Sequence, residues 1–272
     1  MLSSCSADPK PSLPYAFPSG AYAVSNETAI LSDSSRSWDD GGERVAPREI
    51  PIKVYSPALT NAGPFPLLFL SHGLGGNLNG QSYLAEYLAS SGYVVVSVQH
   101  HRSDSDYLKA HGALAFTYAA SEAETRLLRP KDMSFVLDVV SSGKTGIGLL
   151  ALHRIDLLKV GVLGHSFGAF TTLACLGATF DGGTDVSDGR FLCGVAYSPQ
   201  GPGTLGYDTH SWDASYRPTM TLAGTADTSI GTFFAYERRI PFDDMPATGA
   251  KYHETLNNAV HSSFGDAPAD NG

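Results

Sequence analysis

A serine in a glycine-flanked turn is the first candidate for chemistry in this chain. Ser166 lies in the segment Gly164-His165-Ser166-Phe167-Gly168, which follows an apolar run and precedes a run of small and apolar residues. Glycines two positions before and after a serine let a strand turn sharply into a helix, because the chain must pass close to itself. The N-terminus of that helix offers free N–H groups to a developing negative charge. We predict that Ser166 is a nucleophile; the alternative is a tight turn that only packs.

A nucleophilic serine needs a general base and an acid that orients the base. Asp227 follows a predicted strand over 219–222, and His261 follows another over 251–256, so both would leave the sheet in the same sense. His261 would take the proton from Ser166 and return it to the leaving group, while Asp227 would hold the imidazole tautomer. The order serine, aspartate, histidine is the one expected with this kind of turn.

Backbone donors for an oxyanion are predicted upstream of the serine. The segment Ser71-His72-Gly73-Leu74-Gly75-Gly76 leaves a predicted strand over 66–70. With such a loop, the N–H after His-Gly and the N–H after the serine form the oxyanion hole together. These donors would be Leu74 and Phe167. We interpret His72 as a structural hydrogen-bonding residue, because it precedes the serine and belongs to the loop.

Other ionisable residues compete for these roles. Asp208 and Asp213 follow a predicted strand over 191–197, but no carboxylate lies directly at the end of that strand. The other histidines, including His100 and His101, are interpreted as loop or core residues. A solvated acidic loop is favoured over a calcium site for three further aspartates: Asp181, Asp185 and Asp188.

Apolar runs and periodicities predict alternating strands and helices. The runs over 66–70 and 93–98 are continuous, which suits strands covered on both faces. Strands are predicted over 50–55, 66–70, 93–98, 159–163, 191–197, 219–222 and 251–256. Helices are predicted over 80–91, 113–123, 131–140 with Pro130 opening its first turn, and 166–176. The alternation predicts an α/β fold with a doubly wound, mostly parallel sheet and helices on both faces.

The chain divides into an N-terminal segment and one large domain. Turn-forming residues dominate up to about residue 45, which predicts a flexible tether over residues 1–47. Residues 48–272 are predicted to form the catalytic domain. A lid-like insertion is expected over 101–129, because long insertions at the carboxyl ends of strands usually cover the ligand crevice.

Composition excludes several classes of protein. The chain has 272 residues, with 18 Lys+Arg and 27 Asp+Glu, so its net charge is −9 and a nucleic-acid-binding face is not expected. With 42% apolar residues, the chain is not of the disordered class, and no apolar run approaches the ~20 residues that span a bilayer. Three cysteines are too few for a disulfide framework. Cys175 and Cys193 are interpreted as buried thiols, with a bridge between them as the alternative.

The N-terminal residues Leu2-Ser3-Ser4-Cys5 resemble a bacterial lipobox, in which the cysteine is acylated after the signal is cleaved. Pro- and Ser-rich sequence from Ala7 to Gly20 follows, as expected of a tether, but the n- and h-regions of a signal are missing. An accidental match is the alternative. We predict an extracytoplasmic location: secreted, periplasmic or lipid-anchored at the bacterial envelope.

With these motifs, the sequence resembles the α/β-hydrolase superfamily, most of all its predicted dienelactone hydrolases and platelet-activating-factor-acetylhydrolase-like serine esterases. The matching segments are 66–76, 93–98, 129–132, 162–169, 197–202 and 224–227. The resemblance implies the α/β-hydrolase fold, serine ester hydrolysis, no metal and no organic cofactor. True dienelactone hydrolases use cysteine, so Ser166 departs from that pattern. The fold usually continues with a further helix, whereas only eight residues follow Phe264, so a shortened C-terminus is expected.

The predicted function is therefore serine carboxylic ester hydrolysis with a Ser-His-Asp triad and an acyl-enzyme intermediate. The alternatives are a polyester depolymerase, acting on a plastic or polyhydroxyalkanoate-type polymer, a short-acyl phospholipid acetylhydrolase, and a binding module on an inactive hydrolase fold. Apolar residues near the expected crevice favour an apolar substrate portion, although they suit packing equally: Leu74, Phe167, Tyr107, Phe116 and Trp212. We expect a monomer whose partner is a small-molecule or polymeric ester.

Overall fold

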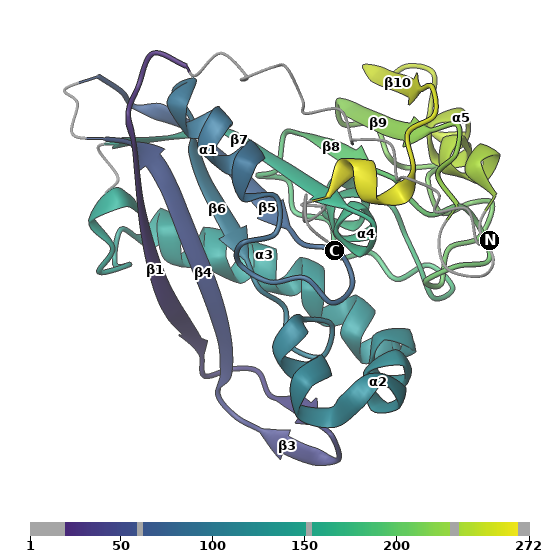
Figure 1. The fold of residues 1–272 in the computed structure, drawn as a ribbon, viewed down its shortest axis with the longest axis horizontal. Helices are drawn as coiled ribbons and strands as arrows, with labels where there is room; N and C mark the ends of the chain where they lie inside the picture. The colour runs from purple at the N-terminus through teal and green to yellow at the C-terminus, as the bar shows by residue number, and fades with distance from the viewer. Residues whose placement is uncertain (1–19, 59–61, 151–153, 229–233, 266–272) are drawn as a thin grey trace, which may run out of the picture.

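The computed structural model describes residues 20–58, 62–150, 154–228 and 234–265, and a single large sheet forms its centre (Figure 1). The strands of this sheet are β1 (Val24–Asp33), β4 (Arg48–Pro57), β5 (Phe65–Ser71), β6 (Val94–Val98), β7 (Ile155–His165), β8 (Cys193–Tyr197), β9 (Thr219–Gly224) and β10 (Lys251–Leu256). Their spatial order is β1-β4-β6-β5-β7-β8-β9-β10. A separate hairpin contains β2 (Trp38–Asp40) and β3 (Glu43–Val45).

Most neighbouring strands of the sheet are parallel. From β6 to β10 in the spatial order every pair is parallel, whereas β4 is antiparallel to both β1 and β6. The carboxyl ends of the parallel strands therefore meet at one edge of the sheet. From β5 the chain continues to β6 on one side, and the later strands β7 to β10 follow on the other side, so the switch point of the strand order lies between β5 and β7. In open α/β sheets ligands bind outside the carboxyl ends of the strands at such a point. The expected doubly wound, mostly parallel sheet is confirmed.

Helices cover both faces of the sheet. The α-helices are α1 (Ser82–Ser90), α2 (Ser105–Ser121), α3 (Ala123–Ser142), α4 (Phe167–Leu176) and α5 (Ile240–Asp244). Short 3₁₀ helices are η1 (Gly148–Leu150), η3 (Ala235–Arg239) and η4 (His261–Phe264). Val94 and Val96 share a core cluster with α3 and α4, whereas Val95 shares one with α1. Because successive side chains of a strand point to opposite faces, α1 lies on one face and α3 and α4 on the other.

The N-terminal part of the described chain belongs to the sheet. β1 pairs with β4 along its whole length, from Val24 opposite Pro57 to Asp33 opposite Arg48. The expected flexible tether over residues 1–47 is therefore wrong from residue 20 onward, and residues 1–19 lie outside the described residues. The burial of β1 explains the error, because only two of its side chains, those of Leu31 and Asp33, are buried, so no apolar run marks the strand.

Helix α3 begins earlier than the sequence predicts. Pro130 was expected to open a helix over 131–140, but it lies inside a helix that starts at Ala123. A proline removes a hydrogen bond from a helix interior and normally ends or kinks the helix. Here Leu128 and Arg129 are buried in the preceding turn, so tertiary contacts outweigh the low helix propensity of proline.

The predicted insertion over residues 101–129 packs against the site edge of the sheet. It contains α2, which is kinked at Gly112, and the first turns of α3. Figure 1 shows α2 beside the β3 end of the hairpin, at the lower end of the view. The N–H of Gly75, in the loop after β5, donates to the carbonyl of Ser103 at 2.8 Å. The insertion thus contacts the predicted oxyanion loop, and its action as a lid stays a prediction.

Candidate active site

Ser166 forms the sharp turn between β7 and α4. Its φ of 56° and ψ of −117° are costly for a residue other than glycine. The Ser166 N–H holds the turn by donating to the Tyr197 carbonyl at 2.9 Å. Glycine is required on both sides: a Cβ on Gly164 would lie 2.2 Å from the Gly168 carbonyl oxygen, and a Cβ on Gly168 would lie 1.9 Å from that of Ser71. The sequence therefore produces a strained turn that presents Ser166 at the start of a helix.

His261 and Asp227 lie beside this serine. His261 begins η4 after β10, and Asp227 follows β9. The His261 Nε2 atom is 2.9 Å from the Ser166 Oγ, and its Nδ1 is 2.8 Å from the Asp227 Oδ1. The carboxylate favours the tautomer with the proton on Nδ1, which leaves Nε2 able to accept the serine proton. The structure thus brings together the three side chains predicted as nucleophile, base and acid.

Two residues that the sequence analysis did not single out hold the Asp227 carboxylate. Ser198 Oγ donates to Oδ2 at 2.5 Å, and Arg238 Nε lies 3.4 Å from Oδ1. Burial raises the pKa of Asp227, but hydrogen bonds from His261 and Ser198 and the charge of Arg238 outweigh it, so the pKa lies below its ordinary value. The carboxylate is therefore ionised in mildly acidic and in neutral solution.

The loop after β5 brings Gly73 close to Ser166. A Cβ on Gly73 would lie 3.4 Å from the Ser166 Cβ, so the two segments are in contact. The Gly73 carbonyl accepts hydrogen bonds from His72 Nδ1 at 2.6 Å and from the Gly76 N–H at 3.1 Å. In a trans peptide the next N–H points opposite to the carbonyl. The Leu74 N–H therefore points away from the His72 ring.

The second expected donor is the N–H of Phe167, the first residue of α4, where helix N–H groups have no partner within the helix. Across the part of the chain that the structure describes, neither this N–H nor that of Leu74 donates a hydrogen bond, so both are available to an oxyanion. Arg129 links the two segments. Its guanidinium donates to the His72 carbonyl and lies 4.4 Å from the centre of the Phe167 ring.

His165 packs against the ring of His261, with 4.7 Å between the ring centres. Its Nε2 is hydrogen-bonded to the His261 carbonyl at 2.9 Å, which requires the proton on that nitrogen. Burial above all, together with the neighbouring His261, lowers the pKa of His165 to about 4. A neutral ring therefore supports the backbone of His261. Sequence reasoning missed this contact, because nothing in the turn motif distinguishes the side chain before the serine.

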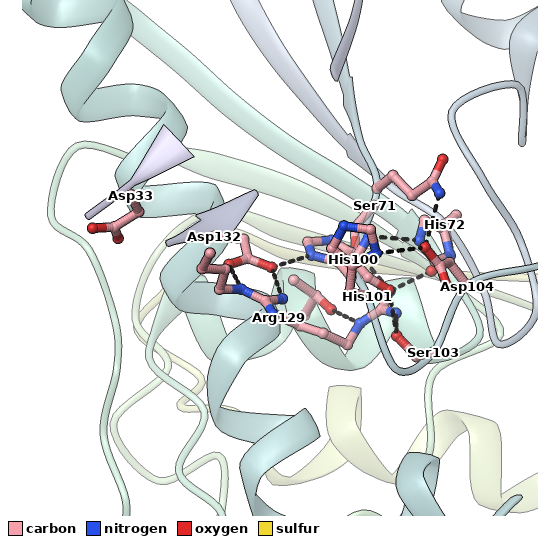
Figure 2. Close-up of polar contacts among 12 residues, drawn as sticks. Asp33, Ser71, His72, His100, His101, Ser103, Asp104, Arg129 and Asp132 are labelled. Carbon is pink, nitrogen blue, oxygen red and sulfur yellow. Dashed lines mark hydrogen bonds and ion pairs between the residues drawn. The ribbon is translucent and has the colours of Figure 1, made fainter. Parts of the chain in front are cut away.

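A second Ser-His-Asp chain lies buried in the molecule (Figure 2). His100 Nε2 is 3.0 Å from Ser71 Oγ, and His100 Nδ1 is 3.0 Å from Asp132 Oδ2. These three side chains are completely buried, so no substrate reaches Ser71. Arg129 Nη2 also donates to the Ser71 Oγ at 3.0 Å, which occupies the hydroxyl oxygen. The distances resemble those of the surface site, but the surroundings are those of a structural network.

The carboxylate of Asp132 has a charged partner in this buried network. Arg48 donates two hydrogen bonds to Asp132, at 2.7 and 2.6 Å. Burial raises the pKa of Asp132, but the charge and hydrogen bonds of Arg48 outweigh it and hold the pKa far below its ordinary value. Burial lowers the pKa of His100 to about 4 and that of His72 well below its ordinary value, so both rings are neutral. The backbone N–H of His100 donates to His72 Nε2 at 3.0 Å, which confirms the structural interpretation of both histidines.

Several other candidates lie away from His261. Asp208 and Asp213 both hydrogen-bond to His210 instead. Asp181 and Asp188 form ion pairs with arginine side chains. Within the described ranges, no group of three or more histidine, cysteine, aspartate or glutamate side chains could hold a metal ion. The competing acid and calcium interpretations therefore have no support in the geometry.

Expectations about a disulfide bridge, about Cys193 and about Trp212 need correction. Cys175 and Cys193 are both free, so the alternative of a bridge between them is wrong. Cys175 is buried, which raises the pKa of its thiol, but Cys193 is exposed, so only one of the two thiols lies in the core. Trp212 is completely buried in a core cluster with Phe170 and does not line a crevice.

The architecture and the turn at Ser166 define the class: this is an α/β-hydrolase fold. A ferulic acid esterase from Streptomyces cinnamoneus matches with a TM-score of 0.63 at 19% identity, over 92% of this chain and 78% of that one. A protein assigned as a dienelactone hydrolase from Klebsiella pneumoniae matches with a TM-score of 0.57 at 15% identity, over 87% of this chain and 88% of the other. At such identities the likeness establishes the fold alone, and the expected fold is confirmed.

Sequence comparison points to one group of hydrolases. The family model for platelet-activating factor acetylhydrolase, isoform II, matches residues 43–124, which include the loop after β5 but end before Ser166. The platelet-activating factor acetylhydrolase of Cavia porcellus is 28% identical over 190 residues, which are 60% of this chain and 41% of that protein. That of Bos taurus is 29% identical over 162 residues, 48% of this chain and 34% of the other. The chain thus spans less than half the length of these relatives, and the expected resemblance is confirmed.

Proposed function

We propose that this protein is a serine carboxylic ester hydrolase that acts through an acyl-enzyme intermediate. The observation that carries the proposal is the chain of hydrogen bonds from Ser166 through His261 to Asp227, at 2.9 and 2.8 Å. The backbone N–H groups of Leu74 and Phe167 are the proposed oxyanion hole. Similarity to platelet-activating factor acetylhydrolases supports the same chemistry.

In the proposed reaction, His261 Nε2 takes the hydroxyl proton of Ser166 as Oγ attacks the ester carbonyl carbon. The carbonyl electrons move to oxygen, and the N–H groups of Leu74 and Phe167 stabilise that oxyanion. The oxyanion then collapses, the C–O bond to the alcohol breaks, and His261 gives its proton to the leaving alkoxide. Water activated by His261 releases the acyl group as an acid and restores the serine. Asp227 keeps its negative charge throughout and stabilises the imidazolium.

A short-acyl phospholipid is a second candidate substrate. The match to the acetylhydrolase family model over residues 43–124 and the two acetylhydrolase relatives favour it. Hydrolysis of such a lipid uses the same acyl transfer as a simple ester and differs in the alcohol portion. Comparing kcat/KM on a short-acyl phospholipid, p-nitrophenyl acetate and a polyester film separates the candidates. A strong preference for the phospholipid supports the second candidate, whereas release of soluble monomer from the film favours the predicted depolymerase alternative.

The two Ser-His-Asp chains supply a matched test of the proposed nucleophile. Ser166→Ala is expected to abolish turnover of p-nitrophenyl acetate and covalent labelling by a fluorophosphonate, with an unchanged far-UV circular dichroism spectrum. Ser71→Ala removes the buried serine and is expected to remain labelled, because the probe cannot reach that side chain. Ester turnover that survives in folded Ser166→Ala refutes the proposed function.

We also propose an extracytoplasmic location, with lipid attachment at Cys5, and a monomeric state. The lipobox-like residues that support the anchor lie outside the described residues. Among the helices that the structure describes, none is long and apolar enough to cross a membrane. Mass spectrometry of the protein from its native host tests the anchor: an acylated Cys5 is expected, and an unmodified N-terminus that retains Met1 contradicts it.

A further inference from the structure

A buried arginine lies against the proposed triad from a part of the chain that carries no catalytic motif. Arg238 belongs to the short helix η3, and only 1% of its surface is exposed. Its neighbour Arg239 has a side chain that is 55% exposed and pairs with Asp243 within the next turn. Burying a guanidinium is costly unless its charge is compensated. The side chain of Arg238 therefore needs partners that Arg239 does not.

The contacts of Arg238 connect three loops at the carboxyl edge of the sheet. Its Nη1 donates to the carbonyls of Ser198 and Pro199, after β8, at 3.1 and 3.0 Å. Its Nε lies 3.4 Å from Asp227 Oδ1, after β9, and its Nη2 lies 3.4 Å from His261 Nδ1, after β10. The carbonyl contacts fix the guanidinium, so its positive charge has a set position beside the histidine.

Among the described residues, three ionisable side chains face the His261 ring, each from a different segment. Asp227 favours the imidazolium, because its carboxylate contacts Nδ1. His165, from the end of β7, is neutral in mildly acidic and in neutral solution, because its pKa lies at about 4. Arg238 is the cation of the group, and a cation this close opposes a second positive charge on the ring. Without Arg238, protonated His261 and Asp227 would form an ion pair with no net charge, which would hold the proton more firmly.

We propose that Arg238 is a positioning residue that holds the Asp227 carboxylate against His261 and opposes a positive charge on the His261 ring. The inference rests on the proposed function, in which neutral His261 is the base. A base that is already protonated cannot accept the proton of Ser166, so the acid limb of the kcat/KM profile reports the proton affinity of His261 in the free enzyme. The guanidinium thus extends the active pH range of the enzyme downward.

The experiment measures kcat/KM against pH with p-nitrophenyl acetate, which does not ionise in this range. Arg238→Gln is expected to move the midpoint of the acid limb upward by about one pH unit, the size of a like-charge interaction at 3.4 Å with the dielectric constant of water. Arg238→Lys keeps the positive charge and is expected to keep the midpoint. Arg239→Gln is the matched control, because this arginine is exposed, and its profile is expected to equal that of the native chain.

The possible results separate the inference about Arg238 from the proposed function. If Arg238→Gln folds and keeps the native midpoint while its plateau falls, the arginine only supports the structure and the inference is overturned. If Arg238→Gln does not give a native near-UV circular dichroism spectrum, Arg238→Lys decides, because an upward shift in a variant that retains the charge also overturns the inference. A native chain without any ester turnover refutes the proposed function instead.

Discussion

Acidification is expected to destabilise the folded protein through the buried ring of His100. Burial lowers the pKa of this side chain to about 4, from an ordinary value of 6.5 that applies to the unfolded chain. Between these two pH values His100 is protonated in the unfolded chain but not in the folded protein. The contribution of His100 to stability is therefore fully present above pH 6.5 and is lost as the pH falls towards 4.

The size of this loss of stability follows from the pKa shift of His100. One pKa unit corresponds to about 1.4 kcal/mol, so the titration of His100 removes about 2 kcal/mol between pH 7 and pH 5 and about 3 kcal/mol by pH 4. Asp132 does not offset this loss, because its pKa lies far below its ordinary value and it stays ionised over the same range. The neutral rings of His72 and His165 add losses of stability of the same sign. The free energy of unfolding of the whole protein therefore falls more steeply with decreasing pH than His100 alone predicts.

Urea unfolding at a series of pH values isolates the part of the loss due to His100. The free energy of unfolding of the native chain is compared with that of His100→Gln, which cannot titrate. The difference in free energy of unfolding between the native chain and His100→Gln is expected to decrease by about 3 kcal/mol from pH 7 to pH 4. A constant difference for His100→Gln would refute the reasoning.

Two further predictions concern stability and are read from urea unfolding at neutral pH. Gly168→Ala places a Cβ 1.9 Å from a backbone carbonyl of β5 and is expected to cost about 3 kcal/mol or more, whereas Gly148→Ala, with nothing within 4 Å, is expected to be nearly neutral. Equal effects of the two alanines would contradict this. Arg48→Ala leaves the buried carboxylate of Asp132 without its main partner and is expected to cost about 3–5 kcal/mol. Arg44→Ala breaks a pair whose arginine side chain is 57% exposed, and a loss above about 1 kcal/mol there would be unexpected.

The sequence predicts the positions of Ser166, Asp227 and His261 for a simple geometric reason. Each follows the end of a predicted strand, and parallel strands present their carboxyl ends at one edge. Locating the strands therefore places the loops that follow them side by side, whatever the helices between them do. The glycines around Ser166 add a local signal, because the turn admits no side chain at those positions.

The features that the sequence does not predict depend on packing between distant segments. β1 has mostly exposed or half-buried side chains, and its place in the sheet comes from backbone pairing with β4. Pro130 locally favours the start of a helix, but buried contacts of the preceding residues extend the helix towards its N-terminus. Arg238 and Arg239 are adjacent and chemically identical, and only the packing of η3 against the sheet edge buries one and exposes the other.

The two Ser-His-Asp chains show why residue types and distances do not by themselves define a catalytic site. The serine-to-histidine distance is 3.0 Å at Ser71 and 2.9 Å at Ser166, and both histidines contact an aspartate that is completely buried. Ser71 is the last residue of a regular strand. Its hydroxyl accepts a hydrogen bond from Arg129 and has no route to solvent. At Ser166 a strained backbone turns the hydroxyl towards a histidine that is 25% exposed, beside N–H groups that can bind an oxyanion. Backbone strain, exposure and available donors therefore separate the proposed catalytic serine from the structural one, and they follow from the turn between β7 and α4.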